Sequence, residues 1–304
     1  MESFSLTAQD GLDVACFSWP CADAQGVVVL SHGMGEHAQR YDWVAEQLNT
    51  AGYAVYAKDH RGHGLSMHAK PGDMGSDGWN GTLRDIEQLI QYARNAHPER
   101  PLILLGHSMG SMLAQQYITL YGSSIDALVL SGSPGTRPRL AGWILKILAT
   151  IEKWRHGAGE HSEFLQNRLF GSSNENFEPA RTGYEWLSRD EAQVDKYVAD
   201  EHCGFVLSCG SLIDMANGSL QARKNKALQK IPKKLPIYVF AGEADPVHGE
   251  KAGIETLLAS YGQHEINSVE MKWYPDGRHE MFNEINRDEV VADLIQWLPK
   301  AQQP

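Results

Sequence analysis

The chain has 304 residues, of which 42% are hydrophobic and 21% are charged, and its formal net charge at pH 7 is -11. A chain of this length can bury a full core, and no apolar run reaches the roughly 18 residues of a membrane-spanning helix. The acidic balance argues against nucleic acid as a partner and against attraction of the whole protein to an anionic membrane. We therefore expect a soluble globular protein.

The first residues and the cysteines bear on the compartment. Glu2 stands where a secretory signal peptide carries basic residues, and no apolar stretch follows it. The cysteines fit neither a C-x-x-C pattern nor a zinc-ligand spacing, so buried thiols are the expected interpretation. They are Cys16, Cys21, Cys203 and Cys209. These observations predict a cytoplasmic protein.

Short apolar runs alternate along the chain with segments of helical length. The runs cover residues 26–30, 53–57, 102–105, 127–130, 236–241 and 269–274. Between them, residues 43–52 and 82–99 have helical patterns that end near a glycine and a proline. Continuous apolar strands separated by helices are typical of a parallel sheet covered on both faces. The predicted fold class is α/β, with a mostly parallel, doubly wound sheet.

This alternation stops between about residues 134 and 204, where the sequence becomes polar, aromatic and helix-like without a clear strand. We interpret this region as a helical cap inserted into one continuous domain, because no repeat or linker interrupts the chain. The expected organisation is a first part of the core at 1–133, the cap at 134–204 and a second part of the core at 205–304.

A candidate nucleophile follows the third apolar run, where residues 106–110 read Gly-His-Ser-Met-Gly. A serine needs a base to take its proton, and a sharp turn must hold its oxygen clear of the sheet. The flanking glycines allow that turn, because side chains there would clash with neighbouring backbone. The motif alone is weak, but a strand before it and a helix after it are the setting that it requires. Ser108 is therefore the predicted nucleophile.

The base and its orienting carboxylate are expected later in the chain, in the order serine, acid, histidine. Asp245 follows the run at 236–241, and His279 follows the run at 269–274. Both residues then lie at the carboxyl edge of the sheet near Ser108, where chemistry gathers in open α/β sheets. Asp276 and Asp59 are weaker candidates, because the first is only three residues from His279 and the second lies in an early loop.

An oxyanion needs two backbone N–H donors. Met109 directly follows Ser108 and is expected to supply one of them. The glycine-rich stretch at 32–35 follows the first apolar run, and we assign the second donor to Met34 within it. The stretch at 59–66 also holds histidines and an aspartate, but its glycines and serine favour a tight turn over a metal site.

Taken together, the motifs SHGMGEHAQRY, DHRGHGLS, GHSMG, GEADPV and YPDGRHEMFNE resemble those of the α/β-hydrolases, and in particular the monoacylglycerol lipase and lysophospholipase family. The resemblance covers almost the whole core in the family's order, whereas the cap matches only in place and approximate length. It implies a serine hydrolase that cleaves lipid esters, with Ser108, Asp245 and His279 as the triad and Met34 and Met109 at the oxyanion. It implies no metal and no organic cofactor.

Other functions remain open at this stage. A lysophospholipase or a short-chain carboxylesterase uses the same triad behind a differently shaped cap. An S33-type aminopeptidase shares the fold and needs acidic groups for the substrate's α-amine. The cap offers Glu160, Glu163, Glu175 and Glu178. A ligand-binding protein on a retired hydrolase fold is the non-enzymatic alternative, whereas a dehalogenase or epoxide hydrolase is disfavoured because those relatives carry an aspartate in place of Ser108.

One segment of the cap points to lipid independently. Apolar residues recur at helical spacing and form one stripe, which consists of Leu140, Trp143, Ile144, Ile147, Leu148, Ile151 and Trp154. Residues 134–156 also hold five basic residues against one acid, Glu152; the basic residues are Arg137, Arg139, Lys146, Lys153 and Arg155. We expect the stripe to pack on the core as a lid. A transient contact with a membrane surface is the alternative.

Overall fold

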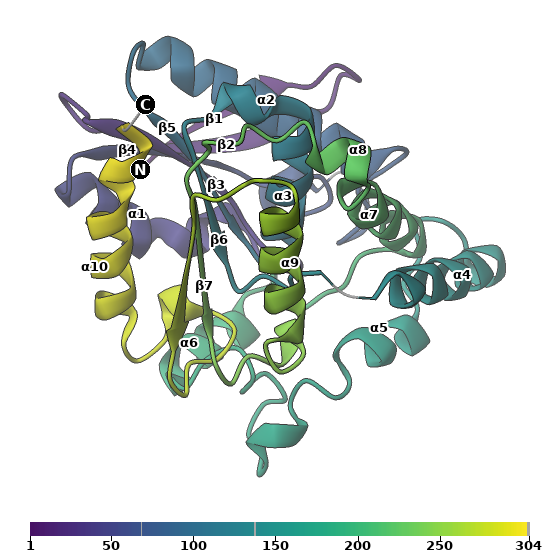
Figure 1. Ribbon diagram of the computed structural model, residues 1–304. Coiled ribbons are helices and arrows are strands. Elements are labelled where there is room, and N and C mark those ends of the chain that lie inside the picture. The colour runs from purple at the N-terminus through teal and green to yellow at the C-terminus, as the bar shows by residue number, and fades with distance from the viewer. Residues whose placement is uncertain (68, 137, 303–304) are drawn as a thin grey trace.

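The computed structural model describes residues 1–67, 69–136 and 138–302 (Figure 1). Its centre is an eight-stranded sheet in the order β1-β2-β4-β3-β5-β6-β7-β8. The strands are β1 (Glu2–Thr7), β2 (Asp13–Trp19), β3 (Gly26–Ser31), β4 (Tyr53–Lys58), β5 (Leu102–His107), β6 (Ala127–Ser131), β7 (Ile237–Gly242) and β8 (Val269–Tyr274). The pairs β1–β2 and β2–β4 are antiparallel, and all other pairs are parallel. The predicted α/β fold with a mostly parallel sheet is confirmed.

The six predicted apolar runs form β3 to β8, but the prediction missed the antiparallel strands β1 and β2. In β1 the side chains are alternately exposed and half-buried, because this strand lies at the edge of the sheet. Such a strand carries a period of two in place of a continuous apolar run. The search for continuous runs therefore overlooked it.

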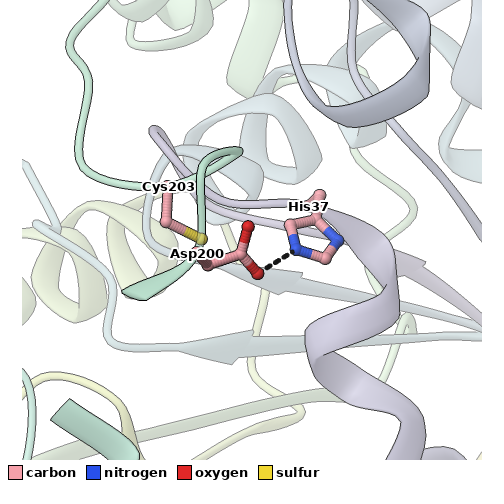
Figure 2. Close-up of side chains that lie close together, drawn as sticks. All are labelled: His37, Asp200 and Cys203. Atoms are coloured by element: carbon pink, nitrogen blue, oxygen red, sulfur yellow. Dashed lines mark hydrogen bonds and ion pairs between the residues drawn. The ribbon is translucent and has the colours of Figure 1, made fainter. Parts of the chain in front are cut away.

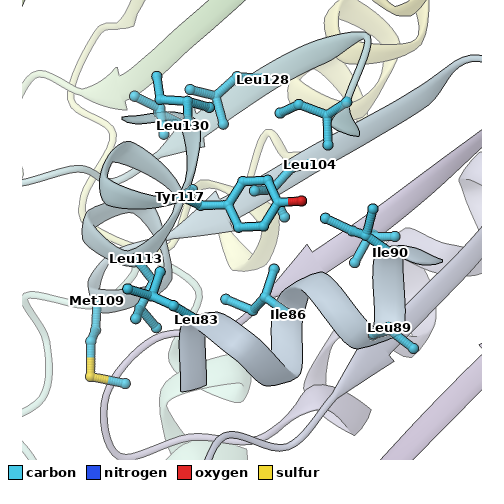
Figure 3. Close-up of a cluster of buried hydrophobic side chains, with 14 of the residues drawn as sticks. Leu83, Ile86, Leu89, Ile90, Leu104, Met109, Leu113, Tyr117, Leu128 and Leu130 are labelled. Carbon is cyan, nitrogen blue, oxygen red and sulfur yellow. The ribbon is translucent and has the colours of Figure 1, made fainter. Parts of the chain in front are cut away.

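Helices cover both faces of the sheet. One face carries α1 (Asp42–Thr50) and α10 (Arg287–Trp297), and the other carries α2 (Gly78–Ala96), α3 (Met109–Tyr121) and α9 (Ala252–Gln263). In β5, Leu102 and Leu104 face the second group of helices, whereas Ile103 and Leu105 face the first. Figure 3 shows the core between α2, α3 and the sheet. Two packed cores thus fix the sheet edge that carries the site.

Between β6 and β7 the chain forms a group of helices beside the sheet. These are α4 (Arg139–His156), α5 (Glu163–Phe170), α6 (Glu191–Ala199), α7 (Cys209–Ala222) and α8 (Asn225–Leu228). A short 3₁₀ helix at Glu175–Phe177 belongs to the same region, and others lie elsewhere at Ala38–Tyr41, Gly64–Ser66, Gly122–Ser124, Pro246–His248, Met281–Asn283 and Leu298–Gln302. Helix α7 packs against α2 and α3 and also against α4, so it connects the outer helix α4 to the core (Figure 1).

Most of the apolar stripe of α4 does not pack on the core, so the expectation that it does is wrong. Six of its seven members are exposed, namely Leu140, Trp143, Ile144, Ile147, Ile151 and Trp154. The buried residues of this helix are Ala149 and Glu152, and Leu145 packs on the core cluster together with Leu148, the seventh member of the stripe. The packing side uses small and mixed residues, so the hydrophobic pattern alone indicated the wrong face. Arg137 lies outside the described residues.

Within the described part of the chain, no helix combines the length and the apolar character needed to cross a bilayer.

Candidate active site

Ser108 lies at the turn between β5 and α3, and its backbone has φ 50° and ψ -115°. A non-glycine residue in such a sparsely populated region costs about 1–3 kcal/mol, so the surroundings must enforce it. The two flanking glycines let the turn close. A Cβ on Gly106 would lie 2.5 Å from the carbonyl oxygen of Gly110, and a Cβ on Gly110 would lie 2.0 Å from that of Ser31. No larger residue fits at either position.

The three residues predicted as a triad are joined by hydrogen bonds. His279 Nε2 lies 2.9 Å from Ser108 Oγ, and His279 Nδ1 lies 2.9 Å from Asp245 Oδ2. Asp245 follows β7 and also accepts a hydrogen bond from the backbone N–H of Val247 at 2.8 Å. His279 and Asp245 are buried, whereas Ser108 is partly exposed. The carboxylate thus holds Nδ1–H of the imidazole and leaves Nε2 free to accept the serine proton.

The neighbouring histidines His279 and His107 have pKa values that are shifted in opposite directions. Burial lowers the pKa of His279, but the carboxylate of Asp245 outweighs burial and the net pKa is raised. His107 stands 4.8 Å from it between ring centroids, and burial together with the charge of His279 lowers the pKa of His107 to about 3. His107 therefore stays neutral, and the imidazole of His279 is the one that can hold a proton near neutral pH.

The loop at 33–36 holds the predicted donor Met34 beside Ser108, and its backbone is fixed from two sides. Glu36 Oε1 accepts the N–H of Gly33 at 2.5 Å. His32 Nε2 accepts the N–H of His60, so Nδ1 carries the proton that it donates to the carbonyl of Gly33 at 2.7 Å. Because C=O and the next N–H point in opposite directions in a trans peptide, the N–H of Met34 faces away from His32.

The two predicted oxyanion donors lie beside Ser108, one in the pocket lining and one next to it in the chain. Met34 lines the pocket together with Ser108. Met109 is the first residue of α3, and the first N–H groups of a helix have no partner within the helix. The helix dipole adds partial positive charge at the same end. Sequence reasoning missed the roles of His32 and Glu36 in fixing the loop at 33–36. The signal for Glu36 is a carboxylate three residues after a glycine in a turn, which can accept the N–H of that glycine.

A buried ion-pair network joins the loop at 33–36 to the loop at 275–280, which carries His279 and is called the histidine loop below. Arg40 donates to Glu36 Oε2 at 2.7 Å and to both oxygens of Glu280 at 2.8 and 2.7 Å. Its guanidinium also lies 4.8 Å from the ring centroid of Tyr197 in α6. Burial raises the pKa of Glu280, but Arg40 outweighs burial and lowers this pKa to about 2. Sequence reasoning did not find this network, because its members are separated by up to 240 residues.

The other candidates of the sequence do not converge on the site. Asp276 is exposed in the turn after β8. Asp59 accepts the backbone N–H groups of Ala38 and Leu65 at 2.9 and 2.8 Å, so it holds the turn at 59–66 together. Arg61 in the same stretch pairs with Asp85. The tight-turn interpretation of this stretch therefore agrees with the structure.

The pocket at Ser108 is walled by residues from the region between β6 and β7. Its lining includes Phe170, Trp186, Leu187, Phe205 and Val206. The ring of Trp186 lies 5.1 Å from that of His279. The backbone carbonyls of Trp186 and Leu187 accept the N–H groups of His279 and Glu280 at 3.2 and 2.8 Å. The same segment therefore shapes the pocket and fixes the histidine loop.

A family model described as serine aminopeptidase, S33, matches residues 22–286, which is most of the chain. This chain is an α/β-hydrolase of that family. The hydrolase is 30% identical to the monoacylglycerol lipase of Mycolicibacterium smegmatis over 97% of this chain and 95% of that protein. It is 27% identical to the monoglyceride lipase of Rattus norvegicus over 96% of this chain and 89% of that protein.

Solved structures agree with this grouping. A thermostable carboxyl esterase from Bacillus coagulans, crystallised in complex with glycerol, superposes with a TM-score of 0.89. It is 28% identical to this hydrolase and covers 98% of this chain, and the match takes in 97% of that chain. The hydrolase therefore groups with the monoacylglycerol lipases and esterases in both sequence and structure.

Proposed function

We propose that this hydrolase cleaves carboxylic esters of lipids, with monoacylglycerol as its substrate and a fatty acid and glycerol as its products. The observation that carries the proposal is the hydrogen-bonded chain Ser108–His279–Asp245 at a pocket with apolar and aromatic walls. The names of the relatives support it, since they describe monoacylglycerol lipases and an esterase that holds glycerol.

In the first half of the reaction, Ser108 Oγ attacks the ester carbonyl while His279 Nε2 takes the serine proton. Asp245 stabilises the imidazolium through the hydrogen bond to Nδ1. The backbone N–H groups of Met34 and Met109 donate to the oxyanion of the tetrahedral intermediate. His279 then gives its proton to the leaving glycerol oxygen, and the acyl group stays on Ser108 as an ester.

In the second half, His279 takes a proton from water, and the resulting hydroxide attacks the acyl carbonyl. The bond to Ser108 breaks, the proton on His279 returns to Oγ, and the fatty acid leaves. Residues 134–204 act as a cap in this proposal. Support comes from the pocket lining, to which this region contributes Phe170, Trp186 and Leu187.

The raised pKa of His279 sets the expected pH dependence. The base acts when neutral, so kcat/KM falls as the pH drops through the pKa of His279, above its ordinary value of 6.5, and is full at higher pH. In Asp245→Asn the remaining rate should fall at a lower pH, because burial then acts without the carboxylate. Measuring kcat/KM against pH tests both statements. A profile that stays flat down to about pH 5 counts against His279 as the base.

The aminopeptidase alternative requires a carboxylate that is free to bind an α-amine in the pocket. Of the residues that the structure describes, the four cap glutamates named for this role do not line it. Glu160 instead pairs with Lys70 at the surface. The pocket carboxylates are Glu36 and Glu280, and both are bound to Arg40. This favours an uncharged ester over a peptide amine.

The deciding experiment compares kcat/KM for 1-monooleoylglycerol, lysophosphatidylcholine, a short-chain p-nitrophenyl ester and an aminoacyl p-nitroanilide. We expect monooleoylglycerol to be preferred by at least tenfold, or about 1.4 kcal/mol of transition-state stabilisation. Preference for another ester leaves the serine mechanism standing and removes the lipid substrate. A folded protein that turns over none of them and does not react with a fluorophosphonate probe is a ligand-binding homologue instead.

The exposed face of α4 suits contact with the membrane that holds such a lipid. Trp143, Ile147 and Trp154 have exposed fractions of 52%, 56% and 87%. Lys146 lies 5.2 Å from the ring centroid of Trp143, and Lys153 is exposed on the same helix. An apolar face flanked by basic residues fits the boundary between anionic headgroups and acyl chains. We assign this face to a lipid surface, reached transiently from the cytoplasm; the absence of disulfides among the four described cysteines supports that compartment.

The double variant Trp143→Ser/Ile147→Ser should bind anionic liposomes at least about tenfold more weakly, since burying each such side chain in the membrane is worth about 1.5–3 kcal/mol. Lys146→Glu/Lys153→Glu should weaken binding to anionic liposomes but not to zwitterionic ones. Co-sedimentation measures both effects. Ile285→Ser, which alters an equally exposed residue outside the cap, is the control and should bind normally. Unchanged binding of the α4 variants removes the membrane assignment.

A further inference from the structure

Three side chains with metal-binding donor atoms meet beside the loop at 33–36, which holds the proposed donor Met34 and is called the oxyanion loop here. His37 directly follows that loop, whereas Asp200 and Cys203 come from the segment after α6. His37 Nε2 lies 2.9 Å from Asp200 Oδ2, and one donor atom from each of His37, Asp200 and Cys203 lies within 4.8 Å of the other two (Figure 2). Two chain segments that are more than 160 residues apart thus present a nitrogen, an oxygen and a sulfur donor to one point.

The surroundings of this cluster are suitable for a cation. His37 is buried, while Asp200 and Cys203 are partly exposed, so an ion can enter from solvent without opening the core. The cation whose charge acts on the Cys203 thiol is Arg40, and the Glu36 and Glu280 carboxylates already bind it. Asp200 accepts hydrogen bonds from His37 and from the backbone N–H of His202, and its negative charge can attract a metal. Within the described part of the chain the Cys203 sulfur makes no hydrogen bond, so no partner has to be displaced from it.

The mixture of donors selects the metal. Imidazole, thiolate and carboxylate are the ligands of Zn²⁺, whereas Mg²⁺ and Ca²⁺ prefer oxygen donors throughout. Around a tetrahedral Zn²⁺, bonds of about 2.0–2.3 Å place neighbouring ligand atoms roughly 3.3–3.8 Å apart. The His37–Asp200 contact has to widen slightly and the Cys203 sulfur has to move inward by about 1 Å, which side-chain rotation can supply.

We propose that His37, Asp200 and Cys203 form a Zn²⁺ site that joins the oxyanion loop to the cap. On binding, a Zn–S bond forms as the Cys203 thiol releases its proton to solvent. His37 moves its proton from Nε2 to Nδ1 and binds the metal through Nε2, in place of donating to Asp200. The fourth ligand of the metal is either water or His202. The ring centroid of His202 lies 6.0 Å from that of His37.

The site lies where the cap already contacts the loop. The backbone N–H of Gly204, the residue after Cys203, donates to the carbonyl of Gly35 at 3.0 Å. Gly204 and Phe205 also line the pocket at Ser108. A metal bound one residue away holds this contact closed, so Zn²⁺ should slow the admission of a bulky ester. This effect on turnover rests on the proposed function, whereas the binding of the metal does not.

The test uses the full chain, freed of metal and kept reduced. We expect the protein to compete with a chromophoric chelator for Zn²⁺ and to bind one equivalent. Millimolar Mg²⁺ should not displace the bound Zn²⁺. Cys203→Ser and His37→Gln should each weaken binding by at least tenfold, since even loss of an outer contact at a metal site costs about 10–100-fold. Cys21→Ser is the matched control, because this half-buried thiol instead contacts the carbonyl of Asn49 and should leave affinity unchanged.

Two further readings separate binding from its consequence. Co²⁺ in place of Zn²⁺ should give a thiolate charge-transfer absorption band, and this band should be lost in Cys203→Ser. Far-ultraviolet circular dichroism checks that each variant is folded. Wild-type protein that binds Zn²⁺ no more tightly than Cys203→Ser overturns the site. If Zn²⁺ binds tightly but leaves the hydrolysis of monooleoylglycerol unchanged, the metal site stands and its closing effect on the pocket is wrong. If the metal-free protein hydrolyses no monooleoylglycerol at all, only the proposed function is overturned.

Discussion

Ser108→Ala should lower the turnover of monooleoylglycerol by at least about 10³ while the protein stays folded. The three residues of such a triad act as a unit, so loss of one removes most of their joint contribution. The hydroxyl of Ser108 is partly exposed, and its known partner is the Nε2 of His279 at 2.9 Å. Removing it leaves no buried charge without a partner, so we expect a change in unfolding free energy of at most about 1 kcal/mol.

Steady-state kinetics and urea unfolding measure the two effects of Ser108→Ala separately. Ser123→Ala, an exposed serine outside the pocket, is the control and should keep full activity. Reaction with a fluorophosphonate probe should be lost in Ser108→Ala alone. If the variant keeps more than about a tenth of the wild-type turnover, another group is the nucleophile and the proposed mechanism is wrong.

Arg40→Met should have the largest effect on stability, about 3–5 kcal/mol of unfolding free energy. Removing one partner from a buried ion pair leaves the other charge without compensation. Here one guanidinium serves two buried carboxylates, Glu36 and Glu280, and both are almost fully buried. Turnover should fall as well, because Glu36 holds the N–H of Gly33 and Glu280 directly follows His279.

Urea unfolding checks the loss in Arg40→Met. Arg84→Met is the matched control, because Arg84 pairs with Asp77 at the surface and such pairs are worth at most about 1 kcal/mol. The double variant Arg40→Met/Glu280→Gln should recover part of the loss, since it no longer buries two unpaired carboxylates. Equal losses in Arg40→Met and Arg84→Met would show that the network does not support the fold.

Arg40 also explains how distant segments act at one site. It contacts the loop at 33–36 through Glu36, the loop after β8 through Glu280 and helix α6 through the ring of Tyr197. A change at any of these contacts can therefore move the Met34 N–H relative to Ser108. A displacement of about 1 Å at a catalytic group can cost about 10²-fold in rate. We therefore expect changes in the region between β6 and β7 to affect the proposed reaction through this network.

Local sequence was sufficient for the parts of this protein that depend on local geometry. Apolar runs predicted β3 to β8, and the signal is clearest in β3 to β7, which are buried along their whole length because both faces of the sheet are covered there. The glycines beside Ser108 revealed the turn, because no Cβ fits there. The positions of Asp245 and His279 after two strands predicted their approach to Ser108, since parallel strands end at one edge of the sheet.

Only the tertiary structure decided which surfaces meet. Periodicity marked the apolar stripe of α4 but did not say what covers it, and α7 packs against the opposite side of that helix. The ion pair of Arg40 with Glu280 and the contact of His37 with Asp200 join residues more than 160 positions apart. A single sequence carries no periodic or spacing signal for such pairs, because their proximity results from how the sheet and the helices between β6 and β7 pack as a whole.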